Sequence, residues 1–222
     1  DESQISIRGS GLRNNFHARG TNLLVNGMPY RNADGFTDFE SLEMLTTEAI
    51  EVYKGGNALR YGGGTLGGAI NLETRTGYTA EPIELYAQGG SNGFFKGQLS
   101  SGQVFDGLDY YASYARTDLD GFRRHSGQRR DRLNGHLGIV LGPRVDLRGF
   151  WFFADVEEDL PGSLTRDEMA AAEQTAQADR HFIKNEMAKG LVRRFRQGRV
   201  GMGLIVNPKQ ESDAEKGESD WN

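Results

Sequence analysis

The sequence predicts a small α+β unit followed by antiparallel strands of a transmembrane β-barrel. The first observation is a change in the hydrophobic pattern near Gly77. Short segments of mixed helical and strand character precede it, and long segments of alternating apolar and polar residues follow from Pro82. The second is that tight turns alternate with long polar links between those segments, as they do in membrane barrels. The third is a glycine-rich stretch, residues 47–77, which organises the first unit.

The composition narrows the alternatives. The chain has 222 residues, including 31 glycines, 5 prolines and no cysteine, which suits many turns and excludes a disulfide framework or a thiolate metal site. The net charge of −5 gives no reason to expect nucleic-acid binding. No apolar run approaches the roughly 18 residues of a membrane helix, but barrel strands give a much weaker signal per segment. Because the chain begins at Asp1 without a signal peptide, we expect it to be processed or cut from something larger.

The first unit is expected to consist of short elements joined by polar loops. We predict strands over residues 4–8 and 22–26, the second ending in an Asn26-Gly27 turn. Asp38 is expected to cap a short helix over the residues that follow it. Two further strands, residues 49–54 and 69–75, are expected to flank one helical turn, because Gly55 permits the reversal that ends the first of them.

The glycines between those two strands invite a nucleotide-binding interpretation, which fails on context. The spacing Gly62-x-Gly64-x-x-Gly67 matches a dinucleotide-binding loop, yet such glycines should follow a strand and open a helix. Here they open a strand. No Gly-Lys-Ser/Thr follows them, so a phosphate-binding P-loop is excluded as well. A glycine-rich hairpin with close backbone packing explains the stretch better.

Alternation assigns the later side chains to two faces. We predict that one face contacts lipid and the other faces the lumen. The lipid-facing set includes Leu137, Ile139, Leu147 and Trp151, and the lumen-facing set includes His136, Asp146 and Arg148. A soluble β-sandwich would alternate in the same way. Aromatic residues near strand ends, as in 110–114 and 150–153, favour the barrel because they resemble interfacial girdles.

The links between these strands predict a truncated barrel. Tight turns are expected at Asp106-Gly107, Gly142-Pro143 and Gln197-Gly198, and long links over residues 89–93, 118–131 and 159–181. The last long link should contain a helix over 165–177, and residues 208–222 should begin another link. This gives about seven strands of the roughly 22 in plugged transporters. An open sheet would leave unpaired edges in lipid, so we expect most of the barrel to lie outside this sequence.

Several motifs resemble one family, the TonB-dependent outer-membrane receptors. The end of their plug domain is similar to Ile50-Glu51-Val52, Gly55, Tyr61-Gly62, Gly67-Gly68-Ala69-Ile70-Asn71 and Thr74. Two earlier plug motifs are similar to Ile7-Arg8-Gly9 and Leu24-Val25-Asn26-Gly27. Gly56 stands where the family usually has proline and Asn26 where aspartate is commoner, but all of these are turn residues. The local sequence around Gly55-Gly56 and Arg60-Tyr61-Gly62 most resembles that of ferric-citrate receptors.

The resemblance implies an organisation and a function. Residues 1–78 would be the C-terminal part of a plug domain and residues 79–222 the N-terminal part of a barrel. The fold class is thus an α+β plug followed by antiparallel transmembrane β-barrel strands. The implied function is active transport of a ferric chelate (siderophore) across the Gram-negative outer membrane, energised through the TonB complex. The alternatives are a receptor for cobalamin or an oligosaccharide, and a passive porin or adhesin barrel.

The resemblance also implies a ligand site. By position, the family's ligand-contacting plug apices correspond to Arg13, Asn14, Asn15, Arg31, Asp34 and Phe36. Glu51 is expected to anchor the plug to a barrel arginine. The loop over 122–132 contains five arginines that we expect to face the cell exterior, where they would bind an anionic chelate or the phosphates of lipopolysaccharide. These are Arg123, Arg124, Arg129, Arg130 and Arg132.

No pattern predicts catalysis or a bound metal. The four histidines, at positions 17, 125, 136 and 181, lie far apart without ligand spacing. The acidic run Glu157–Asp159 suits a solvated loop base better than a calcium site. No nucleophile, base and orienting group can be assembled. We therefore expect no cofactor and no enzymatic activity.

Overall fold

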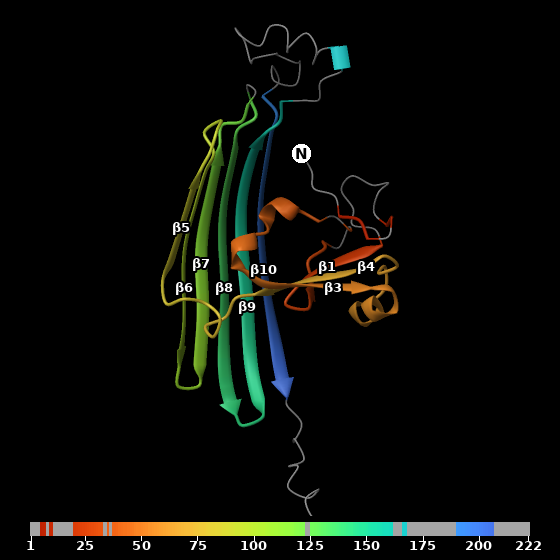
Figure 1. The fold of residues 1–222 in the computed structure, drawn as a ribbon, viewed down its shortest axis with the longest axis vertical. Helices are drawn as coiled ribbons and strands as arrows, with labels where there is room; N and C mark the ends of the chain where they lie inside the picture. The colour runs from red at the N-terminus through yellow and green to blue at the C-terminus, as the bar shows by residue number, and fades with distance from the viewer. Residues whose placement is uncertain are drawn as a thin grey trace, which may run out of the picture.

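The computed structural model describes residues 5–7, 9–10, 20–32, 35, 37–122, 125–161, 166–167 and 190–206. These residues form two sheets, one of four strands in the order β2-β1-β4-β3 and one of six strands in the order β10-β9-β8-β7-β6-β5. We call the described residues through Thr74 the N-terminal unit and the six-stranded sheet the large sheet. The N-terminal unit lies against one face of the large sheet (Figure 1), which we call its inner face.

The N-terminal unit is built around β1 (Thr21–Val25) and β4 (Gly68–Thr74), which pair in parallel. The Asn26-Gly27 turn leads into β2 (Met28–Pro29), and both turn residues have the positive φ that such a tight reversal needs. β3 (Thr47–Lys54) pairs antiparallel with β4, and the 3₁₀ helix η3 (Gly55–Tyr61) joins them. The predicted glycine-rich hairpin is therefore confirmed.

The cores of this unit lie on both faces of its sheet. Leu23 and Leu72 are buried with Tyr30 on one face, and Leu24 packs against buried alanines of η3 and β4 on the other. Neighbouring strand residues point to opposite faces, so Leu23 and Leu24 enter different cores. Burial raises the pKa of Tyr30 to about 12.

Two predictions for this unit were wrong. The strand expected over residues 4–8 is only an isolated bridge between Ile7 and Ser10 among the residues described there. The helix expected after Asp38 is replaced by two 3₁₀ turns, η1 (Phe39–Ser41) and η2 (Met44–Thr46). Glu43 interrupts the helix because its backbone is extended and its carboxylate caps the second turn by accepting from Leu45 N at 3.0 Å.

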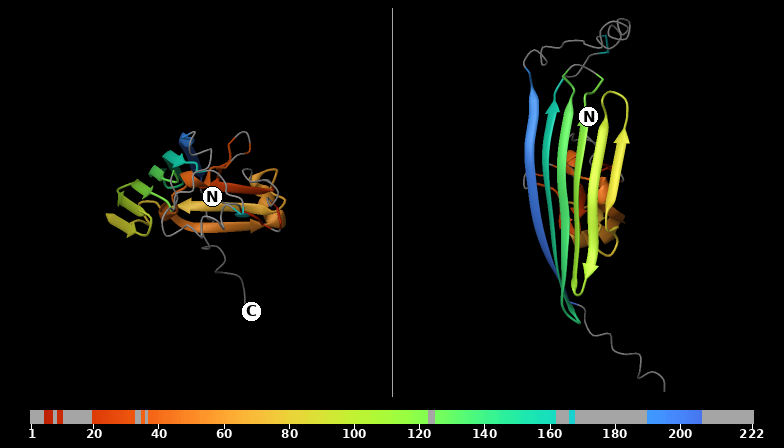
Figure 2. Two further views of the ribbon diagram at one scale, coloured as in Figure 1. Left: turned by 90° about the horizontal axis from the view of Figure 1, so that it is seen from above. Right: turned by 90° about the vertical axis from the view of Figure 1, so that its left-hand side faces the viewer.

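The large sheet runs antiparallel in sequential order, as predicted. Its strands are β5 (Glu84–Gly89), β6 (Phe95–Phe105), β7 (Leu108–Leu119), β8 (Gln128–Gly142), β9 (Val145–Asp159) and β10 (Val192–Val206). Each strand pairs with its neighbour in the chain. From the outer side, the strands lie side by side with the N-terminal unit behind them (Figure 2). Within the described ranges, no helix is long and apolar enough to cross a membrane.

The described part of the large sheet has six strands rather than the seven predicted after the first unit. The expected turn at Gln197-Gly198 lies inside β10, where the two residues pair with Ala154 and Phe153. Gly198 allows close packing against an aromatic ring rather than a chain reversal, because a Cβ at this position would lie 2.7 Å from the Phe153 ring. Of the helix expected over 165–177, only Arg166 and Asp167 are described, and they are helical. Residues 207–222 lie outside the described ranges.

The predicted division into two faces is borne out on β8. Arg132 and His136 are buried on the inner face, whereas Leu133 and Leu137 remain exposed on the outer face. Cross-strand pairing carries the same parity to β9, because His136 pairs with Phe150 and Leu137 with Gly149. The inner face therefore carries the side chains that can hold the N-terminal unit.

Candidate site between the N-terminal unit and the large sheet

The strongest contact between the two parts centres on Glu43. Its side chain is fully buried and accepts from Lys96 Nζ at 2.7 Å and from Arg132 Nη1 at 3.0 Å. Arg132 uses its other nitrogens to donate to the Glu40 carbonyl oxygen, at 2.7 and 3.0 Å. The hydrogen bond from the Leu45 backbone N–H gives the Glu43 carboxylate a third donor. Two strands, β6 and β8, thus grip one buried carboxylate of the N-terminal unit.

Strand β10 supplies a second set of contacts. Arg193 pairs with Asp38 and lies 3.4 Å from Glu158 of β9. Burial raises the pKa of Asp38 despite this arginine. Arg199 donates to the Pro29 carbonyl at 3.1 Å and to Asn32 Oδ1 at 2.6 Å.

The same arginine also takes part in an aromatic stack. Its guanidinium lies 4.6 Å from the centre of the Tyr30 ring, which stacks on Phe152 of β9 at 5.3 Å. A cation over a ring face adds to the hydrogen bonds of the same side chain. The described residues between Pro29 and Glu43 are therefore fixed to β8, β9 and β10 by both polar and stacking contacts.

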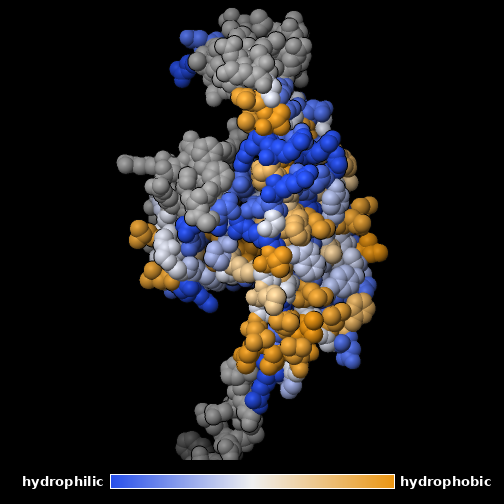
Figure 3. All heavy atoms as spheres, turned by 180° about the vertical axis from the view of Figure 1, so that it is seen from behind, coloured by the Kyte–Doolittle hydropathy of each residue, from blue (hydrophilic) through white to orange (hydrophobic). Residues whose placement is uncertain are grey.

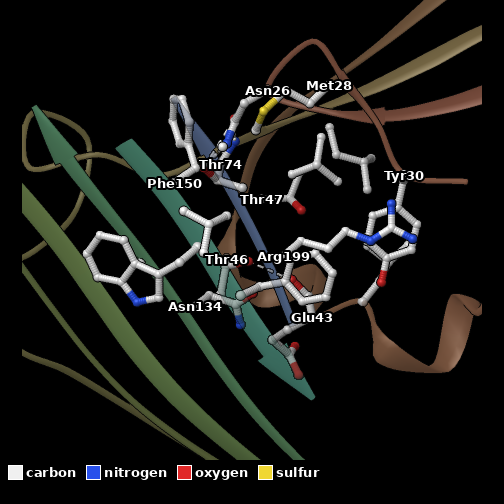
Figure 4. A pocket seen from close by; sticks show the side chains of 18 of the residues that line it. Asn26, Met28, Tyr30, Glu43, Thr46, Thr47, Thr74, Asn134, Phe150 and Arg199 are labelled. Carbon is white, nitrogen blue, oxygen red and sulfur yellow. Dashed lines mark hydrogen bonds between the residues drawn. The ribbon is translucent and has the colours of Figure 1, made fainter. Parts of the chain in front are cut away.

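A cavity of about 470 Å³ lies between the N-terminal unit and the large sheet, beside these contacts. Asn26, Thr46 and Thr74 line it from the unit, and Asn134 and Phe150 from the large sheet (Figure 4). The buried side-chain nitrogen of Asn134 has no hydrogen-bond partner in the described part of the chain. The volume lies within the range of small-molecule sites, roughly 300–1,000 Å³.

Near the end of the sheet with tight turns, Asp109 holds the segment that joins the two parts. Its carboxylate is buried, accepts from Gly77 N at 3.2 Å, and lies 3.1 Å from His136 Nδ1 and 3.6 Å from Arg148 Nη1. Gly138 makes room for it, since a Cβ there would lie 2.0 Å from Asp109 Oδ1. The connection between the parts is thus clamped to β7 and β8.

Of the six predicted ligand-contacting residues, the structure describes one. Arg31 is exposed, and its Nη1 lies 3.7 Å from the position of a Cβ at Gly64, so it stands beside the glycine loop. The other five lie outside the described residues: Arg13, Asn14, Asn15, Asp34 and Phe36. Their role as ligand contacts stays a prediction.

The prediction for the arginine-rich loop was wrong in part. β8 begins at Gln128, so Arg129, Arg130 and Arg132 lie in a strand and alternate between faces. Arg132 points inward to Glu43, and Arg130 donates to Glu158 at 2.7 Å. Arg129 is on the outer face with Asp118. Arg123 and Arg124 lie outside the described residues.

Glu51, which the sequence suggests as an anchor, has no arginine of the large sheet among its described partners, so that role stays a prediction. Glu51 accepts hydrogen bonds from Tyr53 at 2.9 Å and from Asn71 at 3.0 Å, both within its own sheet, and these hold its pKa below the usual range. Among the described residues, Glu43 is the fully buried carboxylate that pairs with cationic side chains of the large sheet. No local signal in the sequence indicated Glu43, because its partner Arg132 lies 89 residues away.

The described histidines belong to separate local contacts. His125 Nε2 lies 2.7 Å from the Leu191 carbonyl oxygen, and His136 lies beside Asp109. No cluster of three potential metal ligands occurs among the described residues. The chemistry of this interface is therefore that of ion pairs and hydrogen bonds that hold one part against the other.

Comparisons with known proteins show which family and which proteins this chain is similar to. Residues 1–69 match the family described as the TonB-dependent receptor plug domain. The chain is 30% identical over 181 residues to the vitamin B12 transporter BtuB of Photobacterium profundum, covering 72% of this chain and 29% of that protein. It is 28% identical over 169 residues to the ferric enterobactin receptor of Pseudomonas aeruginosa, covering 65% and 21%. The chain thus spans less than a third of the length of these two curated relatives.

The fold is similar to solved structures as well. The unliganded ferric citrate transporter FecA superposes with a TM-score of 0.65 at 22% identity, covering 94% of this chain and 33% of that chain. The receptor FpvA of P. aeruginosa, in complex with a heterologous pyoverdine and iron, gives 0.61 at 20% identity, covering 93% and 28%. At these identities the similarity concerns the fold.

Proposed function

Because this chain has the plug and the early barrel strands of a TonB-dependent receptor of the Gram-negative outer membrane, we propose that it takes part in active import of a ferric chelate, or siderophore. In this proposal the N-terminal unit is the plug part, the large sheet is the barrel wall, and the boundary lies near residue 78, where the sequence predicts it. The cargo would bind on the side of the long links and pass inward when the plug rearranges.

The observation that carries this proposal is the buried anchor at Glu43. The N-terminal unit is held to the inner face by Lys96 and Arg132, so it fills space that a passive porin would leave open. Cargo can pass only when such contacts change. Binding energy alone cannot drive cargo uphill, so the proposal requires an energy-coupling partner, the TonB complex. Outer-membrane lipid and lipopolysaccharide would surround the outer face.

Arginine chemistry supports an anionic iron chelate as the cargo. Guanidinium groups bind carboxylate and similar oxygens through short, charge-assisted bonds. Arg31 is exposed beside the glycine loop, and Arg13 is its counterpart in the other predicted apex. Two curated relatives are named as siderophore receptors, for ferric enterobactin and as the probable siderophore receptor PirA of Acinetobacter baumannii. The proposed contacts remain Arg13, Asn14, Asn15, Arg31, Asp34 and Phe36.

A second candidate cargo is cobalamin. One curated relative, the Photobacterium transporter, is named for vitamin B12 at 30% identity, which is close to the identity of the siderophore receptors. Identity alone therefore does not choose between the two. The chemistry does make different predictions, because cobalamin offers no cluster of chelating anionic oxygens for Arg13 and Arg31.

Titration of the intact receptor with a cargo panel tests the proposal. The panel contains ferric citrate, a ferric catecholate, a ferric hydroxamate, cobalamin and an oligosaccharide. Arg31→Ala should weaken binding of the true ferric chelate about tenfold or more, because a bond to a charged group contributes roughly 1.5–3 kcal/mol. Arg144→Ala, an exposed arginine at a tight turn on the opposite end of the sheet, is the matched control. Tight binding of cobalamin or the oligosaccharide with no ferric chelate bound would refute the cargo.

A further inference from the structure

Four polar side chains with buried, unpaired atoms stand together on the inner face of the large sheet. Two come from β7 and two from β8, and they pair directly across these strands, so the four occupy adjacent rows. The atoms concerned are Tyr111 Oη, Ser113 Oγ, Asn134 Nδ2 and His136 Nε2, and none has a hydrogen-bond partner in the described part of the chain. We call these residues the polar quartet. Buried polar groups in native proteins are nearly all hydrogen-bonded, so a cluster of exceptions requires an explanation.

The polar quartet borders the cavity of about 470 Å³ that lies between the N-terminal unit and the large sheet. Asn134 and Tyr111 line this cavity, and Tyr111 is only 1% exposed. The neighbouring hydroxyls of Ser100 and Ser113 do not reach hydrogen-bonding geometry with Tyr111. Figure 4 shows Asn134 among the side chains around the cavity. The polar quartet therefore offers the cavity an amide N–H that can donate and a hydroxyl oxygen that can accept.

Much of the remaining cavity lining is apolar. Val25, Met28 and Leu72 contribute from the N-terminal unit, and Phe150 and Phe152 contribute from the large sheet. An apolar cavity of about 150 Å³ is large enough to bind benzene. This cavity, at about 470 Å³, therefore has room for one or two rings. A ring with one polar edge fits the lining, because its body can pack against the apolar side chains while its edge meets Asn134 and Tyr111.

The charged residues that line the cavity already have partners. Glu43 is held by two cationic side chains of the large sheet, and Arg199 donates to two oxygen atoms of the N-terminal unit. A net charge on a ligand would lose its hydration here without gaining a free counter-ion among the described residues of the lining. The ligand that fits this cavity is therefore uncharged.

The position of the cavity along the strands supports the same conclusion. Asn134 and His136 are the next two inward-facing residues of β8 after Arg132, so the cavity lies further from the long links than the Glu43 ion pairs do. Figure 3 shows a similar change on the face it displays, where hydrophilic side chains gather toward the upper end and hydrophobic ones lie lower. A neutral, mostly apolar ligand suits this depth.

We propose that this cavity binds a small neutral aromatic amide, a molecule of one or two rings with a carboxamide edge. A carboxamide carries both an acceptor and donors. Its oxygen accepts from Asn134 Nδ2, and its N–H donates to the Tyr111 hydroxyl, which can itself donate to Ser113. Because such a ligand contacts both parts, it binds only while the N-terminal unit lies against the large sheet, and it stabilises that arrangement by mass action. This site goes beyond the proposed import and does not depend on the cargo.

Fluorine NMR relaxation of three probes tests this site in the intact receptor in detergent, with receptor-free micelles as the baseline. The probes are para-trifluoromethyl benzamide, para-trifluoromethyl benzoate and para-trifluoromethyl toluene, which share a ring and differ in the polar edge. We expect the amide to bind most tightly. Asn134→Leu removes the donor and keeps a side chain of similar size, so it should weaken amide binding about three- to tenfold, as for one neutral hydrogen bond. Binding of the toluene probe should not weaken, which separates a lost bond from a damaged fold.

A second variant fills the cavity. Thr47 lines it from β3, so the larger side chain of Thr47→Phe should abolish binding of both the amide and the toluene probe. Ala49→Phe adds the same ring at an exposed position of the same strand, outside the cavity lining, and is the matched control. Its binding of the amide should equal that of the unchanged receptor.

Hydrogen exchange tests whether the ligand holds the two parts together. At an amide concentration of about nine times its Kd, exchange through opening at η2 should slow about tenfold, because only the closed arrangement binds. Tighter binding of the benzoate, equal binding of the toluene probe, or unchanged amide binding in Asn134→Leu or in Thr47→Phe would each overturn the proposal. Unchanged exchange at η2 with the amide bound would overturn it as well.

Discussion

Breaking the Glu43 anchor should loosen the N-terminal unit from the wall without unfolding the large sheet. Arg132→Met removes the guanidinium that binds the buried carboxylate at 3.0 Å and the Glu40 carbonyl. Lys96, which is partly exposed, then remains as the cationic partner. Removal of one member of a buried pair costs about 3–5 kcal/mol, because the other charge stays buried and poorly compensated. That corresponds to roughly a 10²–10⁴-fold increase in the opening equilibrium.

Hydrogen exchange in the intact, detergent-solubilised receptor can measure this opening. The reporting amides are those of η1 and η2, which contact the wall, and the amides of β8 serve as the internal reference. Arg132→Met leaves the sequence of η1 and η2 unchanged, so faster exchange there reports opening rather than an altered cap. Glu51→Gln is the matched control, because the hydrogen bonds described for Glu51 lie within its own sheet, so this change should alter exchange in β3 and β4 rather than in η1 and η2.

A double-mutant cycle with Glu43→Ala completes the test. Once either partner is gone, removal of the other should add little, so the two effects should fall short of additivity by about 1–3 kcal/mol. Additive effects, or an exchange change of less than about threefold for Arg132→Met, would show that the anchor lies elsewhere. The structural reasoning on Glu43 would then be refuted even if the fold were correct.

Three shorter predictions concern other parts of the structure. Leu137→Arg should destabilise the barrel by roughly 2–4 kcal/mol in denaturant, because it places a charge on the lipid-facing side. Gly138→Ala should displace the Asp109 carboxylate and increase protease cleavage in the connecting segment 75–83, whereas Gly142→Ala has open space and should not. The lowered pKa of Glu51 means that its stabilising contribution is present above its unfolded pKa and is lost as the pH falls through the folded one. Glu51→Gln should therefore make stability of the N-terminal unit less sensitive to acid, as followed by hydrogen exchange against pH.

Each of these has an outcome that contradicts it. Unchanged barrel stability in Leu137→Arg would mean that the two faces have been exchanged. Equal cleavage in Gly138→Ala and Gly142→Ala would mean that Asp109 does not clamp the connection. The same loss of stability at low pH with glutamate or glutamine at position 51 would remove Glu51 from the acid response.

Local patterns in the sequence predicted most strands of the large sheet and the two faces of β8 and β9. Side chains of two kinds alternate along β8 and β9 with a period of two residues, because one side of each strand faces the N-terminal unit and the other faces apolar surroundings. Composition was less informative where one residue type serves two purposes. Gly198 was interpreted as a turn, yet it sits in a strand where an aromatic neighbour needs space. Asp38 was interpreted as a helix cap, yet it pairs with Arg193.

The site was predicted less well because its contacts are long-range. Arg132 and Glu43 are 89 residues apart, and Arg193 and Asp38 are 155 apart, so no local pattern joins them. A cluster of arginines predicts an exposed, anion-binding loop when it is considered only as composition. Once β8 begins at Gln128, alternation sends Arg130 and Arg132 inward and leaves Arg129 outside. The start of the strand therefore decided the function of each arginine.

This dependence on register ties the two faces of the wall to one another. In β8, Arg132 reaches Glu43 on the inner face while the exposed side chain of Leu133 lies on the outer face. A slip of one residue would expose the guanidinium to lipid and leave Glu43 buried with Lys96 alone, so both faces penalise the same error. The register shift between Val140 and Gly142 lies beyond this region, near the tight turn, where it disturbs neither contact. The anchor of the N-terminal unit and the membrane face of the wall are therefore specified together, by the same alternation.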